Sequence, residues 1–111
     1  MKGINQVWVS GNVGAKIVSG VTRDNDPACS FSVAVDDRNR GVTWVRVNAY
    51  GGTASYCLER LRKGCYVSVV GELMNRDGKY GELIEVRGKD IVFIDSLPRE
   101  SKEIESVQES E

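Results

Sequence analysis

The sequence predicts a small all-β domain of five strands with a single helix between the third and fourth strands. Apolar residues alternate with polar residues along five separate segments, which is the period of a strand with one buried face. One further segment repeats its apolar residues at helical spacing instead. The chain of 111 residues is long enough for one core, and 12 glycines against two prolines indicate that glycine forms most of its turns.

The first three strands are predicted from alternation. In the first, Val7 and Val9 share one side, and a bend or bulge is expected at Gly11 and Gly14. The next two strands are separated by a short polar segment. The expected elements are a strand over 3–13, a loop over 19–27, a strand over 29–35, a turn over 36–41 and a strand over 42–50.

The helix is predicted where the spacing of apolar residues changes from every second residue to every third or fourth residue. Thr53 is the expected N-cap, and Gly64 is the expected left-handed stop at the C-terminal end. The apolar stripe between them, at i, i+3, i+4 and i+7, consists of Ala54, Cys57, Leu58 and Leu61.

The last two strands are predicted to form a hairpin. The fourth has Val67, Val69 and Leu73 on one face and leads to Asp77-Gly78, a strong hairpin signal. The fifth covers residues 79–94, with an interruption expected at 88–90. Five strands with one helix in this order are typical of an OB-fold barrel. An SH3-like barrel is the alternative, but a helix of this length at this point fits that fold less well than the OB fold.

Charge divides the chain into two parts. Residues 1–94 carry 13 basic and 10 acidic side chains, whereas residues 95–111 carry two and six. The second part also loses the alternation and is rich in Ser and Glu. We therefore expect an OB-fold domain over 1–94 and a flexible acidic tail over 95–111.

Composition also excludes classes of protein. No apolar run approaches the ~20 residues of a membrane span, and no secretory signal is expected at the N-terminus. The chain has three cysteines and no histidine, so we expect reduced thiols, no metal site, no cofactor and no catalytic residues. A non-enzymatic protein of the cytoplasm is predicted.

The third strand carries the most informative pattern. Its inner face is expected to place Val45, Val47 and Ala49 in the core. Aromatic residues that bracket a cation on the other face suit stacking on unpaired bases, with the guanidinium on phosphate. Packing beneath a loop or in a subunit interface is the alternative. The outward side chains are Trp44, Arg46, Asn48 and Tyr50.

Other exposed residues could extend such a surface. Trp8 points away from the core and could either join the stacking surface or, as we prefer, lie in a contact between subunits. Basic residues cluster in three places and could be either phosphate ligands or ordinary surface charge. The clusters are Arg38 with Arg40, Arg60 with Arg62 and Lys63, and Arg76 with Lys79.

These residues resemble the bacterial-type single-stranded DNA-binding protein family. The resemblance covers residues 4–94 and is carried mainly by Thr43-Trp-Val-Arg-Val47 together with Leu61-Arg-Lys-Gly-Cys-Tyr-Val-Ser-Val-Val-Gly-Glu-Leu73. It implies an OB fold that binds single strands without reading their sequence, and a homo-oligomer, a tetramer in preference to a dimer. It also implies stacking on Trp44 and Tyr50 and phosphate contacts from Arg46, Lys63 and Arg76.

The sequence departs from the family pattern at several positions. Asn39 lies where another stacking tryptophan is usual, and Tyr80 is the aromatic nearest to a further missing one. Val45 replaces a histidine at a subunit contact. The last residues, 107–111, lack the apolar Pro-Phe that recruits replication proteins in the family.

The sequence therefore predicts a single-stranded DNA-binding protein that supports replication, recombination and repair and associates with the nucleoid. The alternative is an OB-fold interaction module or primosomal component whose aromatic face contacts a subunit or partner. The expected nucleic-acid-binding residues are Trp44, Arg46, Tyr50, Arg38, Arg40, Lys63, Arg76, Lys79 and Tyr80, and the expected interface residues are Trp8 and Val45.

Overall fold

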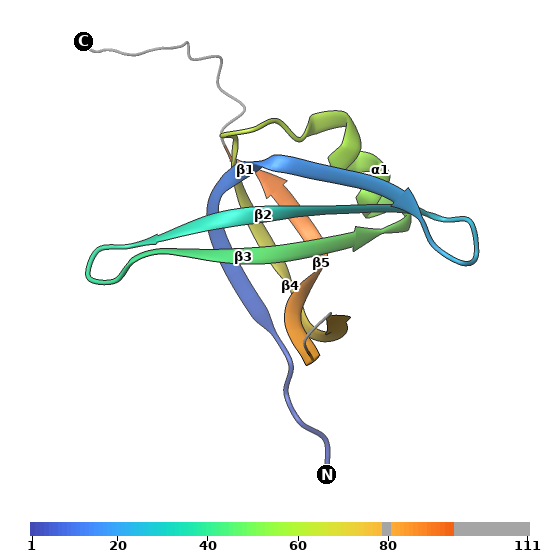
Figure 1. Cartoon of the computed structure of the whole chain (residues 1–111), viewed down its shortest axis with the longest axis horizontal. Helices are drawn as coiled ribbons and strands as arrows, with labels where there is room; N and C mark the ends of the chain where they lie inside the picture. Colours follow the sequence, from blue (N-terminus) through green and yellow to red (C-terminus); the bar gives the residue numbers. More distant parts are fainter. Residues whose placement is uncertain (79–80, 95–111) are drawn as a thin grey trace.

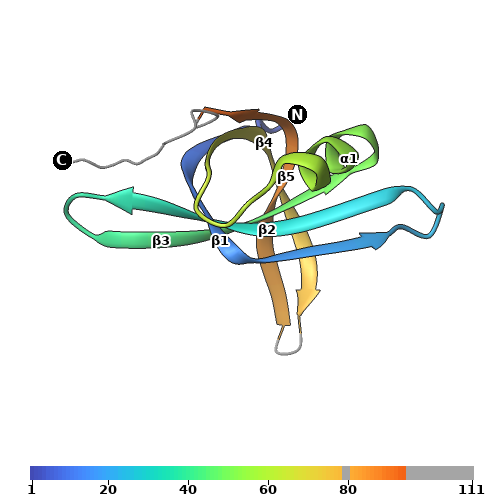
Figure 2. The same cartoon turned by 90° about the horizontal axis from the view of Figure 1, so that it is seen from above.

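The computed structural model describes residues 1–78 and 81–94, which form a closed barrel with hairpin arms that project from it (Figures 1 and 2). The strand order around the barrel is β1-β2-β3-β5-β4, and β1 also pairs with β4. The helix α1 lies between β3 and β4 in the chain. The prediction of an OB-fold barrel is confirmed. The elements are β1 (Val7–Val21), β2 (Pro27–Asp37), β3 (Gly41–Tyr50), α1 (Gly51–Arg60), β4 (Tyr66–Gly78) and β5 (Gly81–Phe93).

Strand β1 is longer than the sequence predicts. Its first half pairs with β4 and its second half with β2, with a register shift between Val13 and Ile17. The strand bends at this shift and continues where the sequence suggested an end. Gly11 allows close packing against β2, because any side chain there would collide with the carbonyl of Ala34. The predicted loop over 19–27 is correspondingly shorter, since β1 continues to Val21.

Both predicted caps of α1 are wrong. The helix begins at Gly51, whose φ of +62° turns the chain directly out of β3, and the N-cap is Tyr50 in place of Thr53. It ends at Arg60, and Leu61 is already extended. Gly64, with φ of +88°, belongs to the turn that follows, in which the amide of Cys65 donates to the carbonyl of Arg62 over 3.1 Å.

Strands β4 and β5 form a long antiparallel pair, as predicted. A register shift at Val70 and Gly71 faces residues 88–90, where the sequence predicted an interruption. Beyond it the pair leaves the barrel as an arm, which projects downward in Figure 2. Leu73 lies on this arm and is exposed, whereas Val67 and Val69 of the same predicted face lie before the register shift and are fully buried.

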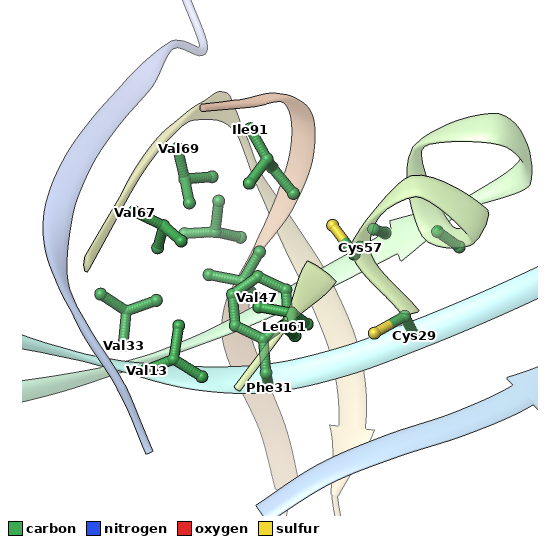
Figure 3. Packing of buried hydrophobic residues seen from close by; sticks show 13 residues of the cluster. Val13, Cys29, Phe31, Val33, Val47, Cys57, Leu61, Val67, Val69 and Ile91 are labelled. Carbon is green, nitrogen blue, oxygen red and sulfur yellow. The ribbon is translucent and has the colours of Figure 1, made fainter. Parts of the chain in front are cut away.

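The hydrophobic core fills the barrel interior and includes residues of α1 (Figure 3). Phe31, Val47 and Val69 are fully buried, and burial of each such side chain stabilises the fold by about 1.5–3 kcal/mol. Cys29 and Cys57 are buried free thiols. Burial raises the pKa of Cys57 to about 12, with smaller contributions from Cys29 and Cys65. Cys57 is therefore a packing residue, as its place in the helical stripe indicates.

No helix in the described part of the chain is long and apolar enough to cross a membrane. The predicted tail over 95–111 lies outside the described residues, and the predicted domain boundary at residue 94 therefore stays a prediction.

Candidate nucleic-acid interface

The candidate interface begins with the outer row of β3, which we define as Trp44, Arg46, Asn48 and Tyr50. The inward half of the predicted alternation holds, because Val47 and Ala49 are fully buried, but Asn48 of the outer row is buried as well. The row faces the neighbouring β2, where the opposing residues are small. They are Ala34, Ser32, Ser30 and Ala28, respectively.

Trp44 forms an open aromatic surface at one end of this row. Its side chain is 61% exposed. The indole reaches across β2 to β1, since a methyl group built on Gly14 would meet Cζ3 of Trp44 at 3.0 Å. The small residues Ala34 and Gly14 thus let the ring lie close to the sheet, supported on one side. Most of the ring stays exposed.

Cations lie on the same strand as this aromatic surface and on two turns. Arg46 follows Trp44 on the same face and has no carboxylate within 4.0 Å among the described residues. Lys63 lies in the turn whose Gly64 amide donates to the carbonyl of Val13 over 2.7 Å, which places it beside the β1 segment that supports Trp44. The exposed Arg38 and Arg40 lie in the β2–β3 turn at the tip of an arm.

A groove occupies the other end of the outer row. It has a volume of about 340 Å³ and lies between the end of the β1–β2 hairpin and the β4–β5 arm. Asn48 and Tyr50 contribute from β3, and Met74 and Arg76 contribute from β4. The groove therefore combines an aromatic ring, an apolar side chain and a cation, and rings and cations are groups that contact the bases and phosphates of single strands.

Asn48 is already engaged by the protein, although the sequence placed it on an open face. Its side-chain nitrogen donates to Oε1 of Glu85 over 2.7 Å, and Met74 lies alongside with Sδ at 3.9 Å. Arg76 forms an ion pair with the same Glu85 oxygen over 3.3 Å. This network ties the β4–β5 arm to β3 at the floor of the groove.

Tyr50 also has a partner that the sequence did not suggest. The guanidinium of Arg87 lies 5.7 Å from the centre of its ring, and the ring is 38% exposed. Glu72 in turn is 4.0 Å from Arg87 and 3.6 Å from Lys89. Arg87 reaches this position because β5 runs parallel to β3 with Asn48 opposite Arg87, a long-range pairing that has no local signal.

The two predicted interface residues lie in different environments. Trp8 is 75% exposed on the outer face of β1, and its Nε1 donates to Oγ of Ser68 over 2.7 Å. Val45 lies opposite Val33 and packs, partly buried, against the core. The subunit contact therefore stays a prediction for both residues.

Lys79 and Tyr80 lie outside the described residues, and their predicted roles stay predictions. Within residues 1–78 and 81–94, no group of three Cys, Asp or Glu side chains could hold a metal ion.

Comparisons with known proteins agree with this geometry. The family model described as "Single-strand binding protein family" matches residues 4–89. Single-stranded DNA-binding protein 2 of Chlorobaculum tepidum is 29% identical, with 95% of this chain and 80% of the relative covered.

Solved structures of similar fold point the same way. The Plasmodium falciparum SSB in complex with ssDNA has a TM-score of 0.73 at 25% identity, with 86% of this chain and 98% of that chain covered. The second single-stranded DNA-binding protein of Mycobacterium smegmatis has a TM-score of 0.68 at 30% identity, with coverage of 81% and 88%. The chain therefore belongs to the single-strand binding protein family, and its prediction as a non-enzymatic OB-fold protein is confirmed.

Proposed function

We propose that this protein binds single-stranded DNA without reading its sequence, by stacking bases on Trp44 and Tyr50. The observation that carries the proposal is the Trp44 indole, which is supported on one side by Gly14 and open on the other. Contact with water alone does not explain an exposed indole at this position. Stacking of a base on the ring does explain it, because such stacking contributes about 1–3 kcal/mol for each base.

Phosphate contacts complete the proposed mode of binding. Arg46 and Lys63 flank the Trp44 end, and Arg76 lines the groove beside Tyr50. A DNA single strand that runs from the Trp44 end of the outer row to the Tyr50 end would meet an aromatic ring and a cation at each end. Every base has a flat π-face, so such a surface tolerates any sequence. Arg38, Arg40, Lys79 and Tyr80 are proposed to extend the path along the arms.

The proposed setting is DNA replication, recombination and repair, with the protein associated with the nucleoid in the cytoplasm. The proposed assembly is a homo-oligomer, a tetramer in preference to a dimer. The exposed Trp8 supports a subunit contact. Its ring lies on the β1–β4 side of the barrel, where it donates a hydrogen bond to Ser68, and it does not line the groove.

The test is a titration of a fluorescently labelled oligo-dT, followed by anisotropy, with two matched tryptophan variants. Trp44→Ala is expected to weaken binding by about 1–3 kcal/mol. Trp8→Ala removes an equally large and exposed ring, and it should lower the mass measured by light scattering while each barrel keeps its intrinsic affinity. Wild-type protein that leaves the anisotropy unchanged would refute the proposal and favour a protein-interaction module instead.

A further inference from the structure

We propose that Glu85 is a positioning residue that holds Arg76 in the groove and competes with DNA phosphates for it. The carboxylate would thereby limit the affinity for single-stranded DNA and its dependence on salt. This inference rests on the proposed single-stranded DNA binding.

Two side chains share one oxygen atom of Glu85. Glu85 is only 8% exposed, and its Oε1 accepts from Asn48 over 2.7 Å and from Nη1 of Arg76 over 3.3 Å. Asn48 is itself buried and lies on β3, so it is fixed. The Arg76 side chain is 51% exposed and lines the groove, which gives it access to a ligand.

A buried carboxylate makes the release of its cation costly. A buried charge is tolerated when it is paired and hydrogen-bonded, and removal of one partner leaves an uncompensated charge. Arg76 is the cation within 4.0 Å of Glu85 among the described residues, and Asn48 is neutral. When Arg76 turns toward a phosphate, Glu85 keeps only the hydrogen bond from the Asn48 amide. The Glu85 carboxylate also repels that phosphate.

Arg46 provides the internal comparison. It lies one position along the outer row from Asn48, yet no carboxylate approaches it within 4.0 Å in the described ranges. One cation of the interface is thus available to phosphate, whereas the other is shared with the protein. The two arginines should therefore contribute unequally to binding.

The decisive variant is Glu85→Gln. Glutamine keeps an oxygen that can accept from Asn48 but removes the charge that holds Arg76. The affinity for oligo-dT is expected to rise about two- to fivefold at low salt, the range that a partly exposed ion pair provides. The slope of log affinity against log salt is expected to steepen by up to about 0.7, the value of one extra phosphate contact on a single strand.

Two controls separate this mechanism from a general change of charge. Glu59→Gln removes the same charge from the exposed surface of α1, away from the groove, and should change neither affinity nor slope appreciably. In an Arg76→Ala background, Glu85→Gln should no longer steepen the slope. A gain of equal size with and without Arg76 would overturn the proposal.

A second measurement keeps the proposal testable if Glu85→Gln does not fold, as judged by circular dichroism. Arg76→Ala in the otherwise wild-type chain should flatten the salt slope by less than half as much as Arg46→Ala does. Equal flattening would show that Arg76 is fully available and would overturn the inference. Absence of oligo-dT binding by the wild-type chain would instead refute the proposed function.

Discussion

The two ends of the outer row of β3 differ in what already touches them. At one end, Trp44 and Arg46 rest on small residues of the neighbouring strands and face solvent on the other side. At the other end, Asn48 is buried against Glu85, and Tyr50 lies beside Arg87. The same alternation of residues therefore produces an open surface and a partly occupied one.

The difference arises from the strand that lies beyond β3. Its parallel partner β5 pairs through Val47 and Asn48, and the β4–β5 arm supplies side chains that cover this end of the row. Among the described residues, the side chains that line this groove do not include Trp44, which stays exposed. A local pattern thus identifies which face a residue lies on, while a distant strand decides whether that face is free to bind.

Substitution of the aromatic residues should give the largest contrast. Trp44→Ala is expected to weaken oligo-dT binding by about 1–3 kcal/mol, and Tyr50→Ala by an amount at the lower end of that range. The reason is that Trp44 is open whereas Arg87 already lies near Tyr50. Anisotropy titrations of both folded variants measure this directly. Equal losses would mean that the two ends bind bases alike.

Stability should show the reverse order. Asn48→Ala removes a buried hydrogen bond to Glu85 and should lower the free energy of unfolding by about 1–2 kcal/mol. Trp44→Ala should change it little, because the exposed ring supports no core residue. Denaturant unfolding of the two variants compares them, with Asn75→Ala on the exposed side of β4 as the matched control. An Asn48→Ala variant as stable as wild type would contradict the network.

Arg46 should reveal its role through salt. Arg46→Ala is expected to reduce the magnitude of the slope of log affinity against log salt by about 0.7, because one phosphate contact on a single strand is lost. Arg60→Ala removes the same charge from α1, where the guanidinium lies 4.6 Å from the ring centre of Tyr56, and should leave the slope in place. Equal slopes for wild type and Arg46→Ala would make Arg46 an ordinary surface charge.

The sequence predicts well whatever depends on local period. The inward Val47 and Ala49, the outward Trp44, and the buried Ala54, Cys57 and Leu61 all follow from spacing along one segment. Leu58 of the same stripe is exposed, because α1 covers the barrel along a narrower face than the spacing implies.

What depends on closure of the barrel could not be predicted in this way. Strand β1 continues beyond Val13 because two different strands pair with its two halves, and no single segment of sequence records both partners. The burial of Asn48 and the approach of Arg87 to Tyr50 likewise require the parallel pairing of β3 with β5. The hydrogen bond between Asn48 and Glu85 joins residues 37 positions apart.

The smallest expected effect concerns the support beneath Trp44. In Gly14→Ala the new methyl group would lie 3.0 Å from Cζ3 of the indole, closer than ordinary van der Waals contact, so the exposed ring must lift away from β1. Binding of oligo-dT should weaken by less than about 1 kcal/mol, because the ring is displaced but not removed. Gly20→Ala is the matched control on the same strand, since nothing lies within 4 Å of its added methyl. If the two glycine variants bind equally well and are equally stable, the contact with Gly14 does not position the indole, and the open end of the row owes its geometry to β2 and β3 alone.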